Sequence, residues 1–120
     1  MIDISDLLNV PYKEYGRTKE EGFDCYGLAI EVYRRMGKTL PDVVYGAEHL
    51  PELVQENIGL FPMMKETDKA EYGVLLEMVY KGNLHIGVCL DGKNFIHTTE
   101  KGVRINHIGV VKIKGMYKWQ

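Results

Sequence analysis

Hydrophobic positions in the first third of the chain repeat with the period of an α-helix. Apolar or small residues recur at the spacing i, i+3, i+4, i+7, which is typical of a helix with one buried face. They are Cys25, Leu28, Ala29, Val32, Tyr33 and Met36. Asp24 precedes this stripe as a candidate N-cap, and Gly37 follows it as a stop. The pattern predicts an amphipathic helix with Cys25 in its first turn, on the buried face.

Weaker helical signals lie on either side of this stripe. Residues Asp3 to Asn9 are compatible with a short helix that ends before Pro11, and residues 12–22 are polar and contain glycine, which indicates an irregular loop. A second helix is expected from about Ala47 to Asn57. The N-terminal half of the chain is therefore predicted to be helical apart from its loops.

After Pro62 the pattern changes to short segments rich in β-branched residues and separated by Gly, Asn and Asp. The expected strands are Val74–Tyr80, His85–Cys89, Lys93–Thr98, Val103–Asn106 and Val110–Lys114. A run of helices followed by a run of strands predicts an α+β fold with a mostly antiparallel sheet of about five strands.

Composition narrows the class of protein. The 120 residues are 45% hydrophobic and 27% charged, which fits one compact domain spanning residues 1–120. The net charge of −2 argues against a nucleic-acid-binding protein. No apolar run is long enough to cross a membrane, and the first residues lack the pattern of a signal peptide, so we expect a protein that is cytoplasmic as synthesised. Its two cysteines are then expected to be reduced thiols.

Cys25 is a candidate nucleophile because of its place in the predicted helix. The free N–H groups of a first turn and the helix dipole stabilise a thiolate, which lowers the pKa of the thiol. The alternative is an inert cysteine on an apolar helix face. Cys89, in the middle of a predicted strand, is expected to be inert and buried, while His49 and His107 are expected to be solvated.

Two further histidines flank a predicted hairpin. A two-residue turn at Asp91–Gly92 would place His85 and His97 on opposite faces. A three-residue loop, 90–92, would pair His85 with His97 and give Gly92 a left-handed conformation. We favour the three-residue loop because only this register brings the two imidazoles together. The shared face also carries Gly87, Cys89 and Phe95, and the small residues are expected to leave room there for the Cys25 helix. The alternative is two unrelated surface histidines.

Two motifs resemble a known family. The segment Gly22-Phe23-Asp24-Cys25-Tyr26-Gly27-Leu28 is similar to G-F-D-C-S-G-L, the nucleophile motif of the NlpC-type cysteine peptidases, a papain-like superfamily of bacterial cell-wall endopeptidases. Residues 85–90, 92, 95–97 and 102–105 resemble the family pattern H-[IV]-G-[IV]-Y-L…G…F-I-H…G-V-R-I. The matches occur in the same order and cover most of residues 10–106. They imply a papain-like fold in which N-terminal helices, including the nucleophile helix, pack on the sheet.

The resemblance also implies roles for individual residues. Cys25 would be the nucleophile, His85 the general base and acid, and His97 the residue that orients His85. Tyr12, in a Pro-Tyr segment like that of the family, would help to bind the oxyanion; the alternative is an ordinary loop tyrosine. Asp24 matches a family aspartate that contacts the free amine of the substrate peptide, a role compatible with capping the helix.

Some positions depart from the family pattern. Tyr26 replaces the usual serine and is expected to lie at the substrate site; together with residues 40–42 (Leu-Pro-Asp), it resembles the phage tail-assembly branch of the superfamily. Cys89 replaces an aromatic residue, and the strand near Val74 lacks the family's aspartate. These departures favour a phage or prophage origin.

The sequence thus predicts a cysteine hydrolase that cleaves amide bonds in peptidoglycan stem peptides and needs no cofactor. The expected partners are the peptide substrate and phage tail proteins, without nucleic acid or membrane, and the protein would be associated with the virion or delivered to the cell wall. A metal site at Cys25, His85 and His97 is disfavoured because no second Cys or His stands at a short chelating spacing. Two alternatives stay open: a non-catalytic tail-assembly or virion component, and a related amidase or acyltransferase with another substrate.

Overall fold

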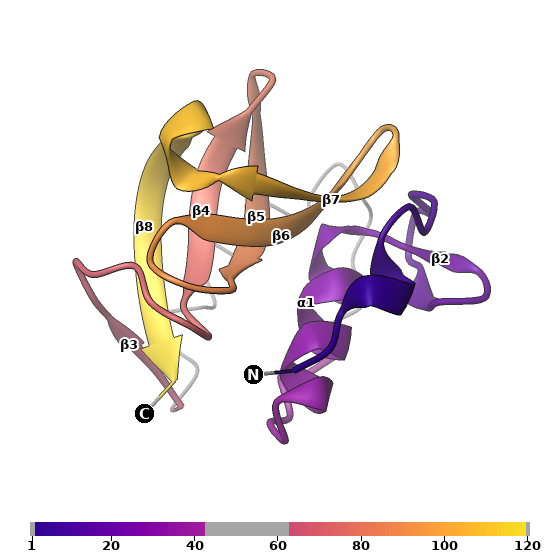
Figure 1. Ribbon diagram of the computed structural model, residues 1–120, viewed down its shortest axis with the longest axis horizontal. Helices are drawn as coiled ribbons and strands as arrows, with labels where there is room; N and C mark the ends of the chain where they lie inside the picture. Colours follow the sequence, from indigo (N-terminus) through magenta and orange to yellow (C-terminus); the bar gives the residue numbers. More distant parts are fainter. Residues whose placement is uncertain (1, 43–62, 120) are drawn as a thin grey trace.

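The computed structural model describes residues 2–42 and 63–119, and it has an α+β architecture (Figure 1). A helix, α1 (Cys25–Arg35), lies beside a six-stranded antiparallel sheet with the strand order β3-β8-β4-β5-β6-β7. The strands are β3 (Met64–Glu66), β4 (Leu75–Tyr80), β5 (Asn83–Cys89), β6 (Asn94–Thr99), β7 (Gly102–His107) and β8 (Lys112–Trp119). A separate two-stranded sheet precedes the helix and contains β1 (Arg17–Thr18) and β2 (Gly22–Phe23). The predicted α+β class and mostly antiparallel sheet are confirmed.

Several predicted elements differ in detail. The expected helix from Asp3 to Asn9 is a single 3-10 turn, Ser5–Leu7. The expected strand Val110–Lys114 begins later, because residues Ile108–Val110 form a second 3-10 turn before β8. Strand β8 then continues to Trp119 and lies between β3 and β4. The predicted helix from Ala47 to Asn57 lies outside the described residues.

Helix α1 begins and ends where its sequence indicates. The Asp24 carboxylate accepts a hydrogen bond from the Gly27 N–H at 2.6 Å, which caps the first turn. At the other end, Gly37 takes a left-handed conformation with φ of +80°, a geometry that stops a helix and that glycine adopts without strain. The predicted helix and its N-cap are therefore confirmed, with Cys25 as the first helical residue.

The face of the sheet that α1 covers is not the one expected from the sequence. The helix shares a core cluster with Leu75, Ile86, Val88 and Ile96. The alternate residues point to the opposite face, where Cys89 and Phe95 belong to a second cluster with Val74, Leu76 and Met78. A Cβ at Gly87 would lie 2.8 Å from the Phe95 ring and 2.9 Å from the Ile96 carbonyl oxygen. Gly87 therefore makes room for Phe95, not for the helix.

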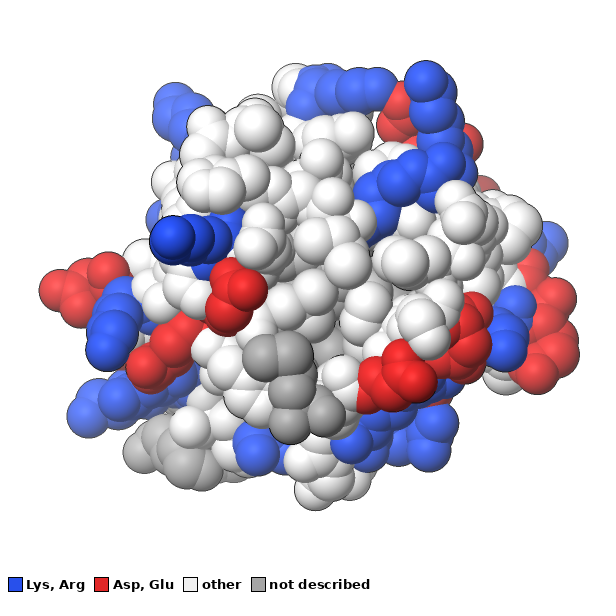
Figure 2. Space-filling view, viewed as in Figure 1, with Lys and Arg blue, Asp and Glu red and all other residues white. Residues whose placement is uncertain are grey.

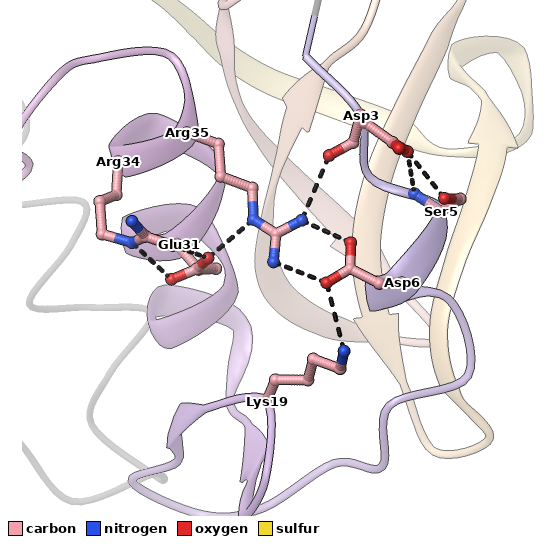
Figure 3. Close-up of polar contacts among 7 residues, drawn as sticks. All are labelled: Asp3, Ser5, Asp6, Lys19, Glu31, Arg34 and Arg35. Atoms are coloured by element: carbon pink, nitrogen blue, oxygen red, sulfur yellow. Dashed lines mark hydrogen bonds and ion pairs between the residues drawn. The ribbon is translucent and has the colours of Figure 1, made fainter.

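The N-terminal segment is fastened to both the helix and the sheet. Arg35 forms ion pairs with Asp6 and with Glu31, so the segment is tied to the last turn of α1 (Figure 3). Farther along, the Asn9 N–H donates to the Val103 carbonyl, and Val103 N–H donates to the carbonyl of residue 10. Residues 9–13 then run between β7 and β2. This path fixes the position of Tyr12, which forms an isolated β-bridge with Phe23.

The described residues contain no helix that is long and apolar enough to span a bilayer. On the face of the molecule drawn in Figure 2, basic and acidic side chains are mixed around a largely uncharged centre. This distribution agrees with the small net charge of −2.

Candidate active site

The two histidines meet on adjacent strands. His85 on β5 and His97 on β6 have their Nε2 and Nδ1 atoms 3.2 Å apart, which is hydrogen-bonding distance. The ring of His97 is fully buried, and Tyr80 packs against both rings, with centroids 5.6 Å from His85 and 5.0 Å from His97. The contact that the sequence predicted between the two imidazoles is confirmed.

The strand register that produces this contact is two residues away from the predicted one. Strands β5 and β6 pair Cys89 with Phe95, not with Lys93, so the loop is Asp91–Lys93. The Asp91 carboxylate accepts hydrogen bonds from the N–H groups of Lys93 at 2.7 Å and Asn94 at 2.8 Å, which stabilises this loop. Gly92 does not adopt the predicted left-handed conformation. A shift of two residues leaves every side chain on the same face, and the rings still meet.

The Cys25 thiol reaches β5 at an opening in the sheet. The Cys89 N–H donates to the Val74 carbonyl oxygen on the side of β4, and N–H directions alternate along a strand, so the Ile86 N–H points toward β6. The β5–β6 pairing, however, ends at Val88. Cys25 belongs to the same core cluster as Ile86, and the Ile86 backbone at this opening favours the thiolate of Cys25. The structure thus brings Cys25 to the residue that directly follows His85.

The thiol is neutral at rest. Burial, reinforced by the negative charge of Asp24, raises the pKa of Cys25 to about 12, although the backbone N–H groups of Ile86, Tyr26 and Cys25 itself act in the opposite direction. The side chain is only 9% exposed. The N–H groups of the first turn favour the thiolate, as expected from the sequence, but loss of hydration outweighs them, so the predicted lowering of the Cys25 pKa is not found.

The imidazoles are neutral as well. Burial and the neighbouring His97 lower the pKa of His85 to about 4, against the opposing effect of the Thr98 backbone. Burial lowers the pKa of His97, whereas its hydrogen bond with Asn106 and the charge of Glu100 raise it. An imidazole with a low pKa keeps a free lone pair at neutral pH, which is the form that can accept a proton.

Asp24 is occupied in the structure by two partners. It is 2% exposed, and its Oδ1 accepts hydrogen bonds from the Gly27 N–H and from Arg17 Nη1, the latter at 2.9 Å. Arg17 also pairs with Asp42 at 3.0 Å, so the guanidinium connects the start of α1 to the segment that follows it. The capping role is confirmed, and contact with a substrate amine stays a prediction.

Tyr26 lies inside the protein. Its side chain is fully buried, and its hydroxyl donates a hydrogen bond to the Pro41 carbonyl oxygen. This placement argues against the substrate contact expected from the sequence. The ring instead holds residues 40–42 against the first turn of α1.

Tyr12 is half-exposed beside the histidines. It lines a cavity of about 250 Å³ whose other walls come from β4, β5, β6 and their turns. These other residues are Tyr80, Lys81, His85, Thr98, Thr99 and Glu100. The pKa of Tyr12 is raised by partial burial and by the nearby Cys25 and Asp24. The catalytic role of Tyr12 stays a prediction.

Asn106 is a further residue of the site that was not predicted from the sequence. Its Oδ1 lies 2.7 Å from Nε2 of His97, on the side of the ring that faces away from His85. The signal was present in the alternation of Val103-Arg104-Ile105-Asn106, which places polar residues 104 and 106 on one face. Relating that face to His97 requires the β6–β7 register, which pairs Asn106 with Phe95.

Cys89 is placed as predicted. It is fully buried in the second core cluster, and burial together with Asp91 raises the pKa of its thiol to about 12. The described part of the chain contains no group of three or more His, Cys, Asp or Glu side chains arranged to hold a metal.

An α+β domain with a thiol at the start of a helix, next to a strand that carries one of two hydrogen-bonded imidazoles, has the layout of a papain-like thiol hydrolase. A comparison with protein-family models matches residues 9–118 to the NlpC/P60 family, and the chain belongs to this family. The family consists generally of papain-like cysteine peptidases that act on peptidoglycan peptides. No curated protein matches the chain.

Proposed function

We propose that this protein is a cysteine hydrolase that cleaves an amide bond in the peptide stem of peptidoglycan, with Cys25, His85 and His97 as its catalytic triad. The observation that carries the proposal is the hydrogen-bonded pair of neutral imidazoles next to the point where the Cys25 thiol meets β5. Membership of the NlpC/P60 family supports the substrate class.

The neutral resting state determines the order of the chemical steps. The Cys25 sulfur attacks the carbonyl carbon of the amide while His85 takes the thiol proton, so charge develops only with substrate bound. The negative oxygen of the tetrahedral intermediate is stabilised by the Cys25 backbone N–H and the Tyr12 hydroxyl. His85 then gives its proton to the leaving amine, and the C–N bond breaks. In the second half, His85 activates water, which releases the acid product and restores the thiol.

The cavity next to His85 is the proposed substrate site. Aromatic walls from Tyr12 and Tyr80 suit the aliphatic parts of a peptide, and the ion pair between Lys81 and Glu100 places both charges at the rim. A peptide stem carries carboxylate and amine groups that such charges can recognise. We propose no cofactor for this reaction.

The test is digestion of purified peptidoglycan, followed by mass spectrometry of the released fragments. We expect cleavage by the wild type and none by Cys25→Ala or His85→Ala. The matched control is Cys89→Ala, which removes the other thiol, on the face of the sheet that α1 does not cover, and should retain activity. Release of fragments by Cys25→Ala at the wild-type rate would contradict the mechanism.

A non-catalytic role as a tail-assembly or virion component is the second candidate, and the nearly buried, neutral thiol of Cys25 favours it. We propose a phage or prophage origin from the resemblance of Tyr26 and residues 40–42 to the phage tail-assembly branch, with synthesis in the cytoplasm and action on the wall after delivery. Intact peptidoglycan after incubation with the folded wild type, together with co-purification with tail proteins, would favour the second candidate. Cleavage of a different amide would indicate a related amidase.

A further inference from the structure

We infer that Asn106 is a positioning residue whose side-chain oxygen sets the tautomers of both imidazoles, so that His85 presents a free lone pair at Nδ1. The inference rests on the proposed function, in which His85 is the general base. The positions of the two ring protons can be measured without an activity assay.

Asn106 determines which nitrogen of His97 carries the ring proton. Asn106 lies on β7 and His97 on β6, on the same face and in diagonal positions, because the register pairs Asn106 with Phe95. Asn106 Oδ1 is 2.7 Å from His97 Nε2. An amide oxygen only accepts hydrogen bonds, so the proton of the neutral His97 ring is on Nε2.

The tautomer of His97 in turn determines the tautomer of His85. A neutral imidazole carries one N–H, so Nδ1 of His97 has a lone pair and accepts a hydrogen bond. Its partner at 3.2 Å is Nε2 of His85, which must therefore carry the proton of that ring. Nδ1 of His85 is left unprotonated, which is the form required of a base. The chain of hydrogen bonds thus runs from β5 through β6 to β7.

The surroundings of the two rings are consistent with a neutral chain. Tyr80 and Phe95 pack against His97, with centroids 5.0 Å and 4.6 Å away, and Tyr80 also packs against His85. Arg104, opposite His97 on β7, directs its guanidinium to Asn9.

The charged rim residues Lys81 and Glu100 pair with each other, and Tyr12 lines the same cavity as His85. A protonated His97 would turn an N–H toward the N–H of His85, and the uncharged amide of Asn106 offers no compensating negative charge. Asn106 therefore favours the neutral, base-competent state of both rings.

Nitrogen NMR of the ¹⁵N-labelled protein tests the tautomers directly, because protonated and unprotonated ring nitrogens have well-separated shifts. We expect both His85 and His97 of the wild type to carry the proton on Nε2. Asn106→Leu, which removes the acceptor with little change in volume, should produce mixed tautomers. Asn106→Asp keeps an acceptor and should retain the wild-type assignment at neutral pH. The control is Ile105→Thr, an exposed neighbour on β7 that should change nothing.

Kinetics supply the second readout. Asn106→Leu should lower kcat by about 10- to 1,000-fold, with KM within about twofold, because the wrong tautomer removes the base without changing the substrate site. Asn106→Asp should keep most of the activity near pH 8. On acidification it should lose activity at a higher pH than the wild type does, because a carboxylate favours protonated His97. If Asn106→Leu does not fold, the pH profile and the ring tautomers of Asn106→Asp test the positioning role instead.

The outcomes separate the inference from the proposed function. Wild-type tautomers in folded Asn106→Leu, or a wild-type kcat in that variant, would overturn the positioning role. A wild type that shows the expected tautomers but cleaves no peptidoglycan would leave the positioning role intact and refute the proposed function instead.

Discussion

Cys25 and His85 both have protonation equilibria displaced toward the neutral form, and burial is the main cause in each case. The alkylation of Cys25 by iodoacetamide tests this state, because only the thiolate reacts. In Cys89→Ala, which isolates Cys25, we expect slow labelling from pH 6 to 8 and a rate that still rises at pH 10. A plateau reached near pH 6 would show a preformed thiolate and contradict the neutral resting state.

The pKa of His85 links its burial to stability. Its pKa is about 4 in the folded chain and about 6.5 when unfolded, so the unfolded state binds the extra proton first on acidification. The free energy of unfolding should therefore be unaffected by this group above pH 7 and fall by up to about 3 kcal/mol as the pH decreases from 6.5 to 4.

Urea denaturation across this pH range measures the effect. His85→Asn, which cannot titrate here, should show a flatter pH dependence than the wild type. Equal slopes for His85→Asn and the wild type would mean that burial of His85 does not destabilise its charged form.

At the scale of elements, the close packing of β5 against β6 is set by Gly87. A methyl group at this position would lie 2.8 Å from the Phe95 ring and 2.9 Å from the Ile96 carbonyl oxygen, and the backbone oxygen cannot move without disturbing the sheet. Gly87→Ala should cost about 1–3 kcal/mol of stability, as expected for overpacking. Thermal denaturation of this variant beside Gly92→Ala, whose closest contact is 3.3 Å, provides the comparison. A smaller loss for Gly87→Ala than for Gly92→Ala would be inconsistent with the packing.

Elements whose signals are local were predictable from the sequence. The stripe that begins at Cys25, its cap at Asp24 and its stop at Gly37 all depend on residues within one helix length. The contact between His85 and His97 was also predictable. It requires the two side chains to lie on the same face of the hairpin, and a register shift of two residues keeps them there. The actual register depends on the Asp91 carboxylate, whose hydrogen bonds to two N–H groups select the loop.

Features that depend on several elements were not predictable in the same way. Alternation along β5 divides its residues into two faces, but it does not state which face the helix covers, and Ile86 and Val88 have that role. The pKa of Cys25 depends on burial that only the folded chain produces. Asn106 reaches His97 through the register of a second hairpin. These features need tertiary structure because each one joins segments that are distant in sequence.

At the scale of the whole molecule, the proposed substrate cavity exists only when three distant segments come together. Tyr12 comes from the N-terminal segment, Lys81 from the β4–β5 turn and Glu100 from the β6–β7 turn. The ion pair between Lys81 and Glu100 connects the two turns at the rim, and Lys81 also lies over the Tyr80 ring. Both partners are exposed, so the pair is expected to influence substrate binding more than stability.

Removing one charge at a time should change KM in opposite directions. For an anionic stem peptide, Lys81→Ala leaves Glu100 at the rim and should raise KM by about two- to tenfold, whereas Glu100→Ala should lower it, because the rim charges act on binding. In Lys81→Ala, kcat should stay nearly constant. The double variant should return toward the wild-type value, and added salt should reduce all three differences because exposed charges are screened. Initial rates over a range of peptide concentrations measure these changes. Shifts of the same sign in the two single variants would show that the rim does not sense substrate charge, and the cavity would then recognise the peptide through its aromatic walls.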